Sequence, residues 1–353
     1  MPKTRKKEAR FSDIAAKAGV GIATVDRVLN DRGNVSPATA LKVVQAAREL
    51  RINRLVPSPY RKQLRYKVIL ARRRFGFAKR MNQAFIKCAS TFAKSMTLER
   101  SFVNEDDAAT LDHEITSCAG KYDGLIVLPV NTLEVRNAIR KISPALPVIT
   151  IATDVDDDAR HAFVGINNVK AGRTAAFLCT PAMHSGKRAA ALCLGHAFAS
   201  QGDRVRGFEA YMAGHHLSEQ VSTHVIDPAT FDACFAFTRR LICETPNLAA
   251  LYDAGVYDDS VVAGVYADAV AAAIVAEKKD RQIHYIGHEL TQGTVQLMQD
   301  GVMNFVIDQD PDQQALRALE MLLHIHGIID HRSPTSQTEF RIYCKENVPN
   351  PAA

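Results

Sequence analysis

Charged and amide side chains follow several apolar runs in this sequence, at points where a ligand could be recognised. Asp154 follows PVITIAT, Asp253 follows LAALY, Glu289 follows YIGH and Gln309 follows NFVID, while Arg204 lies at the start of a predicted helix. Carboxylates, an amide and a guanidinium together offer acceptors and donors, which suits a ligand with several hydroxyl groups. The alternative for each residue is a cap or turn, since Asp at a strand end often caps the next helix.

Aromatic and basic residues follow the first apolar run of the same region. Phe75 and Phe77 offer rings that can stack on the apolar face of a sugar. Residues 72–75, RRRF, can bind an anionic ligand such as a sugar phosphate or a sugar acid. The alternative is that these arginines are ordinary surface residues.

The elements that must position these residues are short apolar runs that alternate with helical patterns from residue 67 onward. The predicted strands are KVILA, SFVN, GLIVLP, PVITIA, FVGI, RAAALCL, THVI, LAALY, IHYIG, NFVID and EFRIYC. This alternation predicts an α/β fold with doubly wound parallel sheets, and its length favours two lobes over one sheet. Ligands of such sheets bind outside the carboxyl ends of the strands, where the polar residues above lie.

Residues 11–50 predict a small all-α unit of three short helices. Ser12 and Asp13 are predicted to cap the first helix, and Gly19 to end it, because glycine takes the left-handed conformation cheaply. Ser36 as a cap and Pro37 at the first helical position predict the start of the third helix. Two helices joined by a tight turn and braced by a third are typical of a helix-turn-helix unit.

The second helix lies in the stretch VGIATVDRVLN and has one apolar side and one polar side. Its apolar residues at helical spacing are Val25, Val28 and Leu29. The opposite side is predicted to enter the DNA major groove, where Arg27 reads a guanine edge or holds a phosphate. Thr24 and Asn30 can hydrogen-bond to phosphates. Asp26 is expected to accept from a cytosine amino group or to pair with a nearby Arg. The alternative is a three-helix bundle that does not bind DNA.

The net charge of the chain is +6, and it is distributed unevenly. Residues 1–66 hold 15 Lys and Arg against 5 Asp and Glu, whereas the remainder holds 29 against 33. A basic head on a mildly acidic body indicates a nucleic-acid-binding module attached to another domain. On charge alone, a solvated basic tail is the alternative.

The head resembles the DNA-binding head of the LacI/GalR repressors over FSDIAAKAGVGIATVDRVLNDRGNVSPATALKVVQAARELRINR. The resemblance implies that Ile22, Ala23 and Arg27 contact bases and that Thr24 and Asn30 contact phosphates. Gly21 and Asp26 depart from the family pattern, which usually or often has Ser at these positions. Losing the Ser at 21 removes a phosphate-contacting hydroxyl or lets the backbone come closer.

The body resembles the type I periplasmic sugar-binding core of the same repressors. The residues that carry this resemblance are PVITIATDV, FVGINNVKAGRTAA, RVRGF, LYDAG, YIGHELT and FVIDQDPDQQA. It implies that Asp154, Arg204, Glu289 and Gln309 contact an effector, and that Asp253 replaces a common Asn. It also implies three crossings of the chain between the lobes, expected near Asn167, Gln309 and Ile329.

These crossings define the expected domains. We expect a DNA-binding domain at 1–54, a linker at 55–66, an N-lobe at 67–166 and 310–329, and a C-lobe at 167–309 and 330–353. The family resemblance implies that the linker forms a hinge helix in the minor groove with a leucine wedge, for which Leu55 or Leu64 is available. Pro57 and Pro59 oppose an ordinary helix, so an extended basic tether is the alternative.

The sequence contains no GxSxG, P-loop or GxGxxG pattern, so we expect no enzyme activity and no cofactor. His284 and His288 lack a third ligand and are expected to be buried strand residues, so no metal is expected. Seven scattered cysteines without a CxxC pattern, no secretory signal and no long apolar run favour a cytoplasmic protein.

The sequence therefore predicts a ligand-responsive transcription regulator, acting as a repressor. Its expected partners are a pseudo-palindromic operator DNA, a small carbohydrate, polyol or sugar derivative, and a second copy of the chain in a homodimer, with a tetramer as the alternative. A stand-alone sugar-binding transport protein and an enzyme on the same scaffold are the competing hypotheses. The basic head argues against the first of these, and the missing motifs argue against the second.

Overall fold

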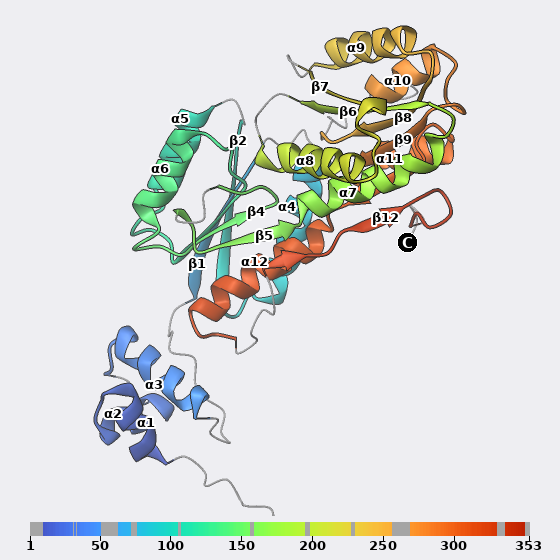
Figure 1. Ribbon diagram of the computed structural model, residues 1–353. Helices are drawn as coiled ribbons and strands as arrows, with labels where there is room; N and C mark the ends of the chain where they lie inside the picture. The colour runs from blue at the N-terminus through green and yellow to red at the C-terminus, as the bar shows by residue number, and fades with distance from the viewer. Residues whose placement is uncertain are drawn as a thin grey trace, which may run out of the picture.

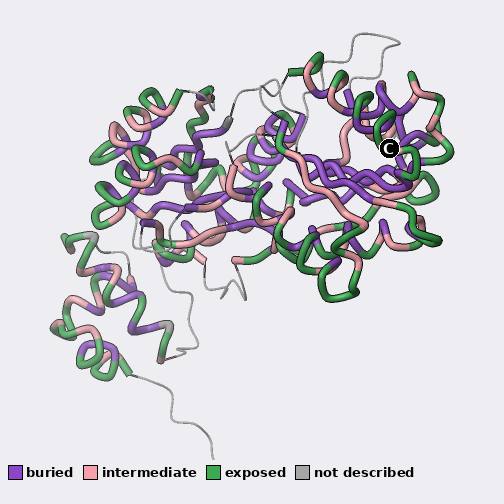
Figure 2. The backbone as a smooth tube through the Cα atoms, turned by 45° about the horizontal axis from the view of Figure 1, so that its top comes forward, coloured by how far each residue is buried: buried purple, intermediate pink, exposed green. Residues whose placement is uncertain are grey.

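The computed structural model describes residues 10–30, 32, 34–50, 63–71, 76–104, 107–155, 159–194, 198–226, 230–255, 269–329 and 336–349. They form a three-helix head and a body that contains two six-stranded sheets (Figure 1). In the body, the central strands are buried, and the helices around them turn their exposed sides outward (Figure 2). No helix in these ranges is long and apolar enough to cross a membrane.

The head consists of α1 (Phe11–Ala18), α2 (Ile22–Leu29) and α3 (Pro37–Glu49) around one apolar cluster. Gly19 ends α1 with a φ of 66°, as predicted. The predicted cap at Ser12 and Asp13 is wrong, because α1 begins at Phe11 with Arg10 as the cap residue. The carboxylate of Asp13 instead accepts from the Arg10 N–H at 2.7 Å, which satisfies a donor that the helix leaves unpaired.

The N-lobe sheet is entirely parallel, with the strand order β11-β5-β4-β3-β1-β2. Its strands are β1 (Leu64–Ala71), β2 (Met96–Val103), β3 (Gly124–Val127), β4 (Val148–Ile151), β5 (Ala162–Ile166) and β11 (Gln337–Thr338). Helices α4 (Gly76–Thr91) and α12 (Pro311–Ile325) share one apolar cluster, and α5 (Ala108–Thr116) and α6 (Leu133–Ile142) share another. The sheet is therefore covered on both faces, as a parallel sheet requires.

The C-lobe sheet has the order β12-β10-β9-β8-β6-β7 and is parallel except for β12. Its strands are β6 (Arg188–Leu194), β7 (Val221–Ile226), β8 (Leu248–Asp253), β9 (His284–His288), β10 (Phe305–Asp308) and β12 (Arg341–Tyr343). The helical segments of this lobe are α7 (Asn168–Cys179), η2 (Thr180–Ala182), α8 (Ala199–Gly214), η3 (Ser218–Gln220), α9 (Phe231–Glu244), α10 (Ala269–Ala276) and α11 (Gln292–Gln299). The predicted doubly wound α/β fold with two lobes is confirmed.

Two predicted boundaries are wrong. The third crossing was expected near Ile329, but β11 still pairs with β5 of the N-lobe, so the chain crosses between Thr338 and Arg341. The linker was expected to reach residue 66, but β1 begins at Leu64. The Leu64 side chain lies in the N-lobe core at 2 % exposure, so it cannot serve as a wedge in DNA. Leu55 and the two linker prolines lie outside the described residues.

Two glycines allow α7 and α8 to cross at unusually short range. A Cβ atom added to Gly172 would lie 1.8 Å from the Arg204 carbonyl oxygen, and one added to Gly207 would lie 2.0 Å from the Val169 carbonyl oxygen. Both obstacles are backbone atoms of the facing helix, which cannot rotate away as a side chain can. This close contact fixes the position of Arg204, one of the predicted effector-binding residues.

Replacing Gly172 by alanine is therefore expected to push the two helices apart and to destabilise the core. Overpacking of this kind costs at least about 2 kcal/mol, which corresponds to a fall of roughly 4–8 °C in Tm. The control is Gly202→Ala on α8, where an added Cβ has no atom within 4 Å. That variant should gain up to about 1 kcal/mol from its better helix propensity. Equal Tm values for the two variants in a thermal unfolding experiment would contradict this explanation.

Candidate functional site

The second helix of the head presents the residues predicted to contact DNA. Val25, Val28 and Leu29 are buried, whereas Ile22 is 55 % exposed and Arg27 lies away from the apolar cluster. The other three predicted residues are Ala23, which is exposed, and Thr24 and Asn30, which are half-buried. The helix thus uses one side to hold the head together and leaves the Arg27 side open. Their contacts with DNA remain predictions.

Asp26 lies on the same helix and is engaged in a local network. Its Oδ1 accepts from Asn30 Nδ2 at 2.7 Å, and its Oδ2 lies 2.9 Å from Arg32 Nη1. Of the two roles expected for this carboxylate, the structure contains the pairing with a nearby Arg. The Asn30 amide nitrogen therefore donates to Asp26 in this structure.

In the body, Glu289 and Gln309 lie side by side at the ends of two adjacent strands. Glu289 follows β9 and Gln309 follows β10, and the Gln309 Nε2 donates to the Glu289 Oε1. Both side chains are almost completely buried, at 1 % and 2 % exposure. Within the described part of the chain, neither Glu289 Oε2 nor Gln309 Oε1 has a hydrogen-bond partner. Glu289 also has a positive φ of 69°, which is costly for a glutamate and persists only where the surrounding structure holds it.

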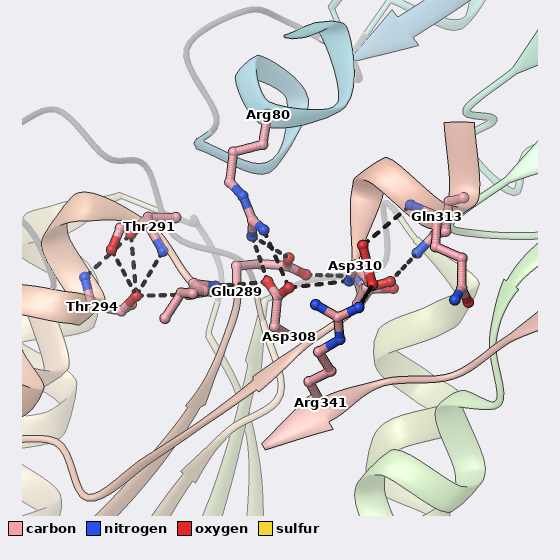
Figure 3. Close-up of polar contacts among 11 residues, drawn as sticks. Arg80, Glu289, Thr291, Thr294, Asp308, Asp310, Gln313 and Arg341 are labelled. Carbon is pink, nitrogen blue, oxygen red and sulfur yellow. Dashed lines mark hydrogen bonds and ion pairs between the residues drawn. The ribbon is translucent and has the colours of Figure 1, made fainter. Parts of the chain in front are cut away.

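An arginine from the opposite lobe reaches this pair. Arg80 of α4 pairs with both oxygens of Asp308 at the end of β10, with Nη2 3.2 Å from Oδ2, and its Nη1 lies 3.8 Å from Glu289 Oε2 (Figure 3). Asp308 also accepts from the Leu290 N–H at 2.9 Å. The interaction joins the N-lobe to the C-lobe, because α4 packs on one sheet and β10 belongs to the other. We call Arg80, Asp308, Glu289 and Gln309 the junction cluster.

Further polar contacts lie beside the junction cluster. Gln314 of α12 donates to the Gln309 carbonyl oxygen at 2.9 Å. Asp310, the cap residue of α12, lies 2.7 Å from Arg341 Nη2 of β12 (Figure 3). Since α12 belongs to the N-lobe and β12 to the C-lobe, the contact between Asp310 and Arg341 links the two lobes.

The surroundings of Glu289 in the junction cluster raise the pKa of its carboxyl group. Burial, assisted by the nearby charge of Asp308, raises the pKa of Glu289 from 4.5 to about 7, while Arg204 and Arg80 oppose the shift. The folded protein therefore holds a proton that the unfolded chain releases between these two pH values. The contribution of this group to stability falls as the pH rises from about 4.5 to about 7.

Glu289→Gln should remove this pH dependence, because the amide is neutral like the protonated acid. As the pH rises from 5 to 8, we expect the Tm of the variant to increase relative to the Tm of the wild type. Thermal unfolding at several pH values measures this difference. Glu209→Gln, at an exposed position of α8, is the control and should show a constant difference. A constant difference for Glu289→Gln as well would contradict the role of Glu289.

Arg204 is buried on the C-lobe side of the site, at 1 % exposure. Its Nε donates to Asn168 Oδ1 at 2.9 Å, and its Nη1 donates to the Ala254 carbonyl oxygen at 3.1 Å. Asp253, 3 % exposed at the end of β8, accepts from the Gly255 N–H at 2.8 Å. Both residues thus support the ends of the strands and helices from which the site is built.

His284 and His288 both lie on β9. The His288 Nε2 lies 2.8 Å from the Tyr252 hydroxyl, and burial together with Arg204 holds the pKa of His288 well below 6.5. His288 is therefore neutral and packed among strands. No group of metal-ligating side chains occurs among the described residues.

Two other predicted effector residues, Asp154 and Phe77, lie in the N-lobe. Asp154 accepts from Thr150 Oγ1 at 2.7 Å, from the Val155 N–H at 2.8 Å and from Arg160 Nε at 2.6 Å, so its local neighbours engage both oxygens. Phe77 packs in the N-lobe core at 7 % exposure, and its stacking on a sugar stays a prediction. Phe75 and the arginines at 72–74 lie outside the described residues.

Two members of the junction cluster, Arg80 and Asp308, were not predicted from the sequence. Asp308 ends the predicted strand NFVID, one residue before Gln309, so its position at a strand end was the available signal. Arg80 lies 228 residues away on a helix, and nothing in its local pattern separates it from a surface arginine.

Comparisons with known proteins agree with this architecture. A family model described as periplasmic binding protein domain matches residues 67–327, and one described as bacterial regulatory proteins, lacI family, matches residues 10–51. A comparison with curated proteins finds no match. The two matched families comprise regulators and binding proteins.

Several solved structures share the fold of the body. A glucose-galactose binding protein from Geobacillus stearothermophilus aligns with a TM-score of 0.66 and 22 % identity, covering 82 % of this chain and all of that one. A carbohydrate transporter solute binding protein from Agrobacterium radiobacter, in complex with D-arabinose, has a TM-score of 0.66 and 14 % identity over 83 % and 98 % of the chains.

A third similar structure, from Bacteroides fragilis, is described as a candidate LacI transcriptional regulator. It has a TM-score of 0.65 and 17 % identity, covering 81 % of this chain and 98 % of that one. A helix-turn-helix head joined to a core of the periplasmic sugar-binding type is the architecture of a ligand-responsive DNA-binding regulator. The chain therefore belongs to the LacI family of bacterial regulatory proteins, and its core is a periplasmic binding protein domain.

Proposed function

We propose that this chain is a transcriptional repressor that binds a pseudo-palindromic operator and is controlled by a small carbohydrate or polyol held between its lobes. The observation that carries the proposal is the junction cluster, in which buried acceptors without a hydrogen-bond partner among the described residues meet an ion pair that spans both lobes. A binding site between mobile lobes is useful to a regulator only if another part of the chain responds. The head, with its open Arg27 side, is that part.

The junction cluster suits a ligand that donates hydrogen bonds. Glu289 Oε2 and Gln309 Oε1 are buried acceptors without a hydrogen-bond partner among the described residues, which is costly, and hydroxyl groups would satisfy both. The charge of Arg80 is already balanced by Asp308, so this part of the site has little to offer an anionic group. The glucose-galactose binding protein and the D-arabinose complex, whose folds are similar, support a carbohydrate as the first class to test.

The ligand acts on the equilibrium between open and closed lobes. Opening would separate Arg80 from Asp308, since α4 packs on the N-lobe sheet and β10 belongs to the C-lobe sheet. A ligand that binds one arrangement more tightly shifts the populations by that difference in affinity. In a homodimer, this shift moves the two heads relative to each other and changes their fit to half-sites about one helical turn apart.

DNA selection combined with a salt titration tests the DNA part of the proposal. The full-length protein should enrich a two-fold symmetric sequence from a random duplex library. Its affinity for that sequence should fall steeply between about 50 and 200 mM salt, because phosphate contacts release counterions. No enriched sequence, or binding that does not depend on salt, would reject a regulator that binds operator DNA.

A thermal-shift screen tests the ligand part. The panel contains neutral sugars, polyols, amino sugars, sugar acids and phosphosugars. A ligand at about 100 times its Kd should stabilise the protein by about 2.7 kcal/mol. The same ligand should fail to stabilise the Gln309→Leu variant, which lacks the amide of the junction cluster. Equal stabilisation of both proteins would place the ligand elsewhere.

A further inference from the structure

The recognition helix of the head carries a carboxylate on a surface expected to approach DNA phosphates. The Asp26 side chain is 35 % exposed and lies one residue before Arg27. A carboxylate in this position would oppose binding if it stood alone, because phosphates carry the same charge. The local contacts of Asp26 decide whether it repels DNA or supports DNA binding.

Both oxygens of Asp26 are engaged by groups that can contact DNA. Asn30 Nδ2 donates to Oδ1 at 2.7 Å, and Arg32 Nη1 donates to Oδ2 at 2.9 Å. The Arg32 backbone N–H also donates to the Arg27 carbonyl oxygen at 2.8 Å. Arg32 is therefore tied to the end of α2 through both its main chain and its side chain. These two contacts hold the Arg32 side chain near the C-terminal end of α2, close to Arg27.

The N–H groups of the Arg32 guanidinium that do not contact Asp26 are available to solvent. Its side chain is 65 % exposed, and a guanidinium has about five N–H donors. The hydrogen bond to Asp26 engages Nη1 alone, so further donors can reach a phosphate without breaking the pair. The positive charge of Arg32 also offsets the repulsion between Asp26 and the DNA.

We propose that Asp26 is a positioning residue for operator binding and that Arg32, held by Asp26, is an additional phosphate contact. This inference rests on the proposed DNA-binding function. Holding a long side chain in place before binding removes part of the ordering cost of association, which corresponds to a roughly twofold to tenfold gain in affinity.

The direction in which one substitution changes the affinity for DNA separates the two possible roles of Asp26, positioning Arg32 or repelling phosphates. If Asp26 positions Arg32, Asp26→Asn should weaken binding roughly twofold to tenfold. If Asp26 only repels phosphates, the same substitution should tighten binding. The probe is the duplex that the wild-type full-length protein selects from a random library, and the measurement is fluorescence anisotropy at several salt concentrations.

Arg32→Ala supplies the second test. It should lower the slope of log affinity against log salt by about 0.9 for each phosphate that the arginine neutralises. In the Arg32→Ala background, adding Asp26→Asn should cause no further weakening, because there is no arginine left to position. Glu49→Gln, a 61 % exposed position on α3, is the control for removing one negative charge from the head. Thermal unfolding confirms that each variant is folded.

Each outcome decides the inference. Weaker binding by Asp26→Asn, a lower salt slope for Arg32→Ala and the disappearance of the Asp26 effect in the double variant would support it. Equal or tighter binding by Asp26→Asn, or an unchanged slope for Arg32→Ala, would overturn it. If the wild-type protein selects no sequence at all, the proposed function fails, and this result is distinct from a failure of the variants.

Discussion

Arg27→Ala is expected to abolish specific operator binding while the core stays folded. Arg27 lies on the side of α2 that does not pack on the head, so its removal leaves the apolar cluster intact. A bidentate contact between Arg and guanine is worth about 1–3 kcal/mol, and a dimer loses two of them. The expected weakening is therefore roughly 30-fold to 20,000-fold in Kd.

The control and the salt dependence refine this prediction. Lys42→Ala removes the same charge from an exposed position of α3 and should change the Kd much less. If Arg27 reads a base, the variant should also lose sequence discrimination. If it holds a phosphate, binding should weaken for all sequences and the salt slope should fall. A Kd within about twofold of the wild type would reject Arg27 as a DNA contact.

Arg204→Ala is expected to destabilise the core strongly, by more than Gly172→Ala. The change leaves Asn168 Oδ1 and the Ala254 carbonyl oxygen without the donor they now have. It also removes a positive charge that favours the ionised form of Glu289. Each buried acceptor left without its donor costs about 1–3 kcal/mol, and thermal unfolding measures the loss for the two together. We therefore also expect loss of the response to the effector.

Arg206→Ala is the matched control for Arg204→Ala. Arg206 lies on the same helix two residues later, but its side chain is 70 % exposed and pairs with Asp203 at the surface. Exposed ion pairs contribute about 0–1 kcal/mol, so the Tm should hardly change. Comparable decreases in Tm for the two variants would show that the burial of Arg204 does not explain its contribution to stability.

The sheet architecture could be predicted because the central strands of each sheet are short, almost fully apolar runs. Every predicted run became a strand, from KVILA in β1 to EFRIYC in β12. The two-residue strand β11, Gln337–Thr338, carries no apolar signal and was missed. Its pairing with β5 depends on tertiary contact, which is also why the third crossing was placed too early.

The candidate site could be predicted only where function follows from position along a strand. Glu289 and Gln309 were found because they directly follow buried strands, and the structure brings them into contact. Arg80 was missed because its contact with Asp308 depends on how two lobes meet. Asp154 also follows a strand, but Arg160, six residues later, donates a hydrogen bond to its carboxylate. The position of Asp154 after a strand does not predict this contact.

The central claim is that a ligand bound at the junction of the lobes changes the affinity of the head for DNA. The most direct test measures the Kd of the full-length protein for its selected duplex with and without the ligand that stabilises the core. Coupling free energies of about 1–3 kcal/mol predict a change of roughly 5-fold to 150-fold in Kd. The Gln309→Leu variant should bind DNA normally and show no change. A ligand that stabilises the wild-type core but leaves its Kd for DNA unchanged would contradict this claim.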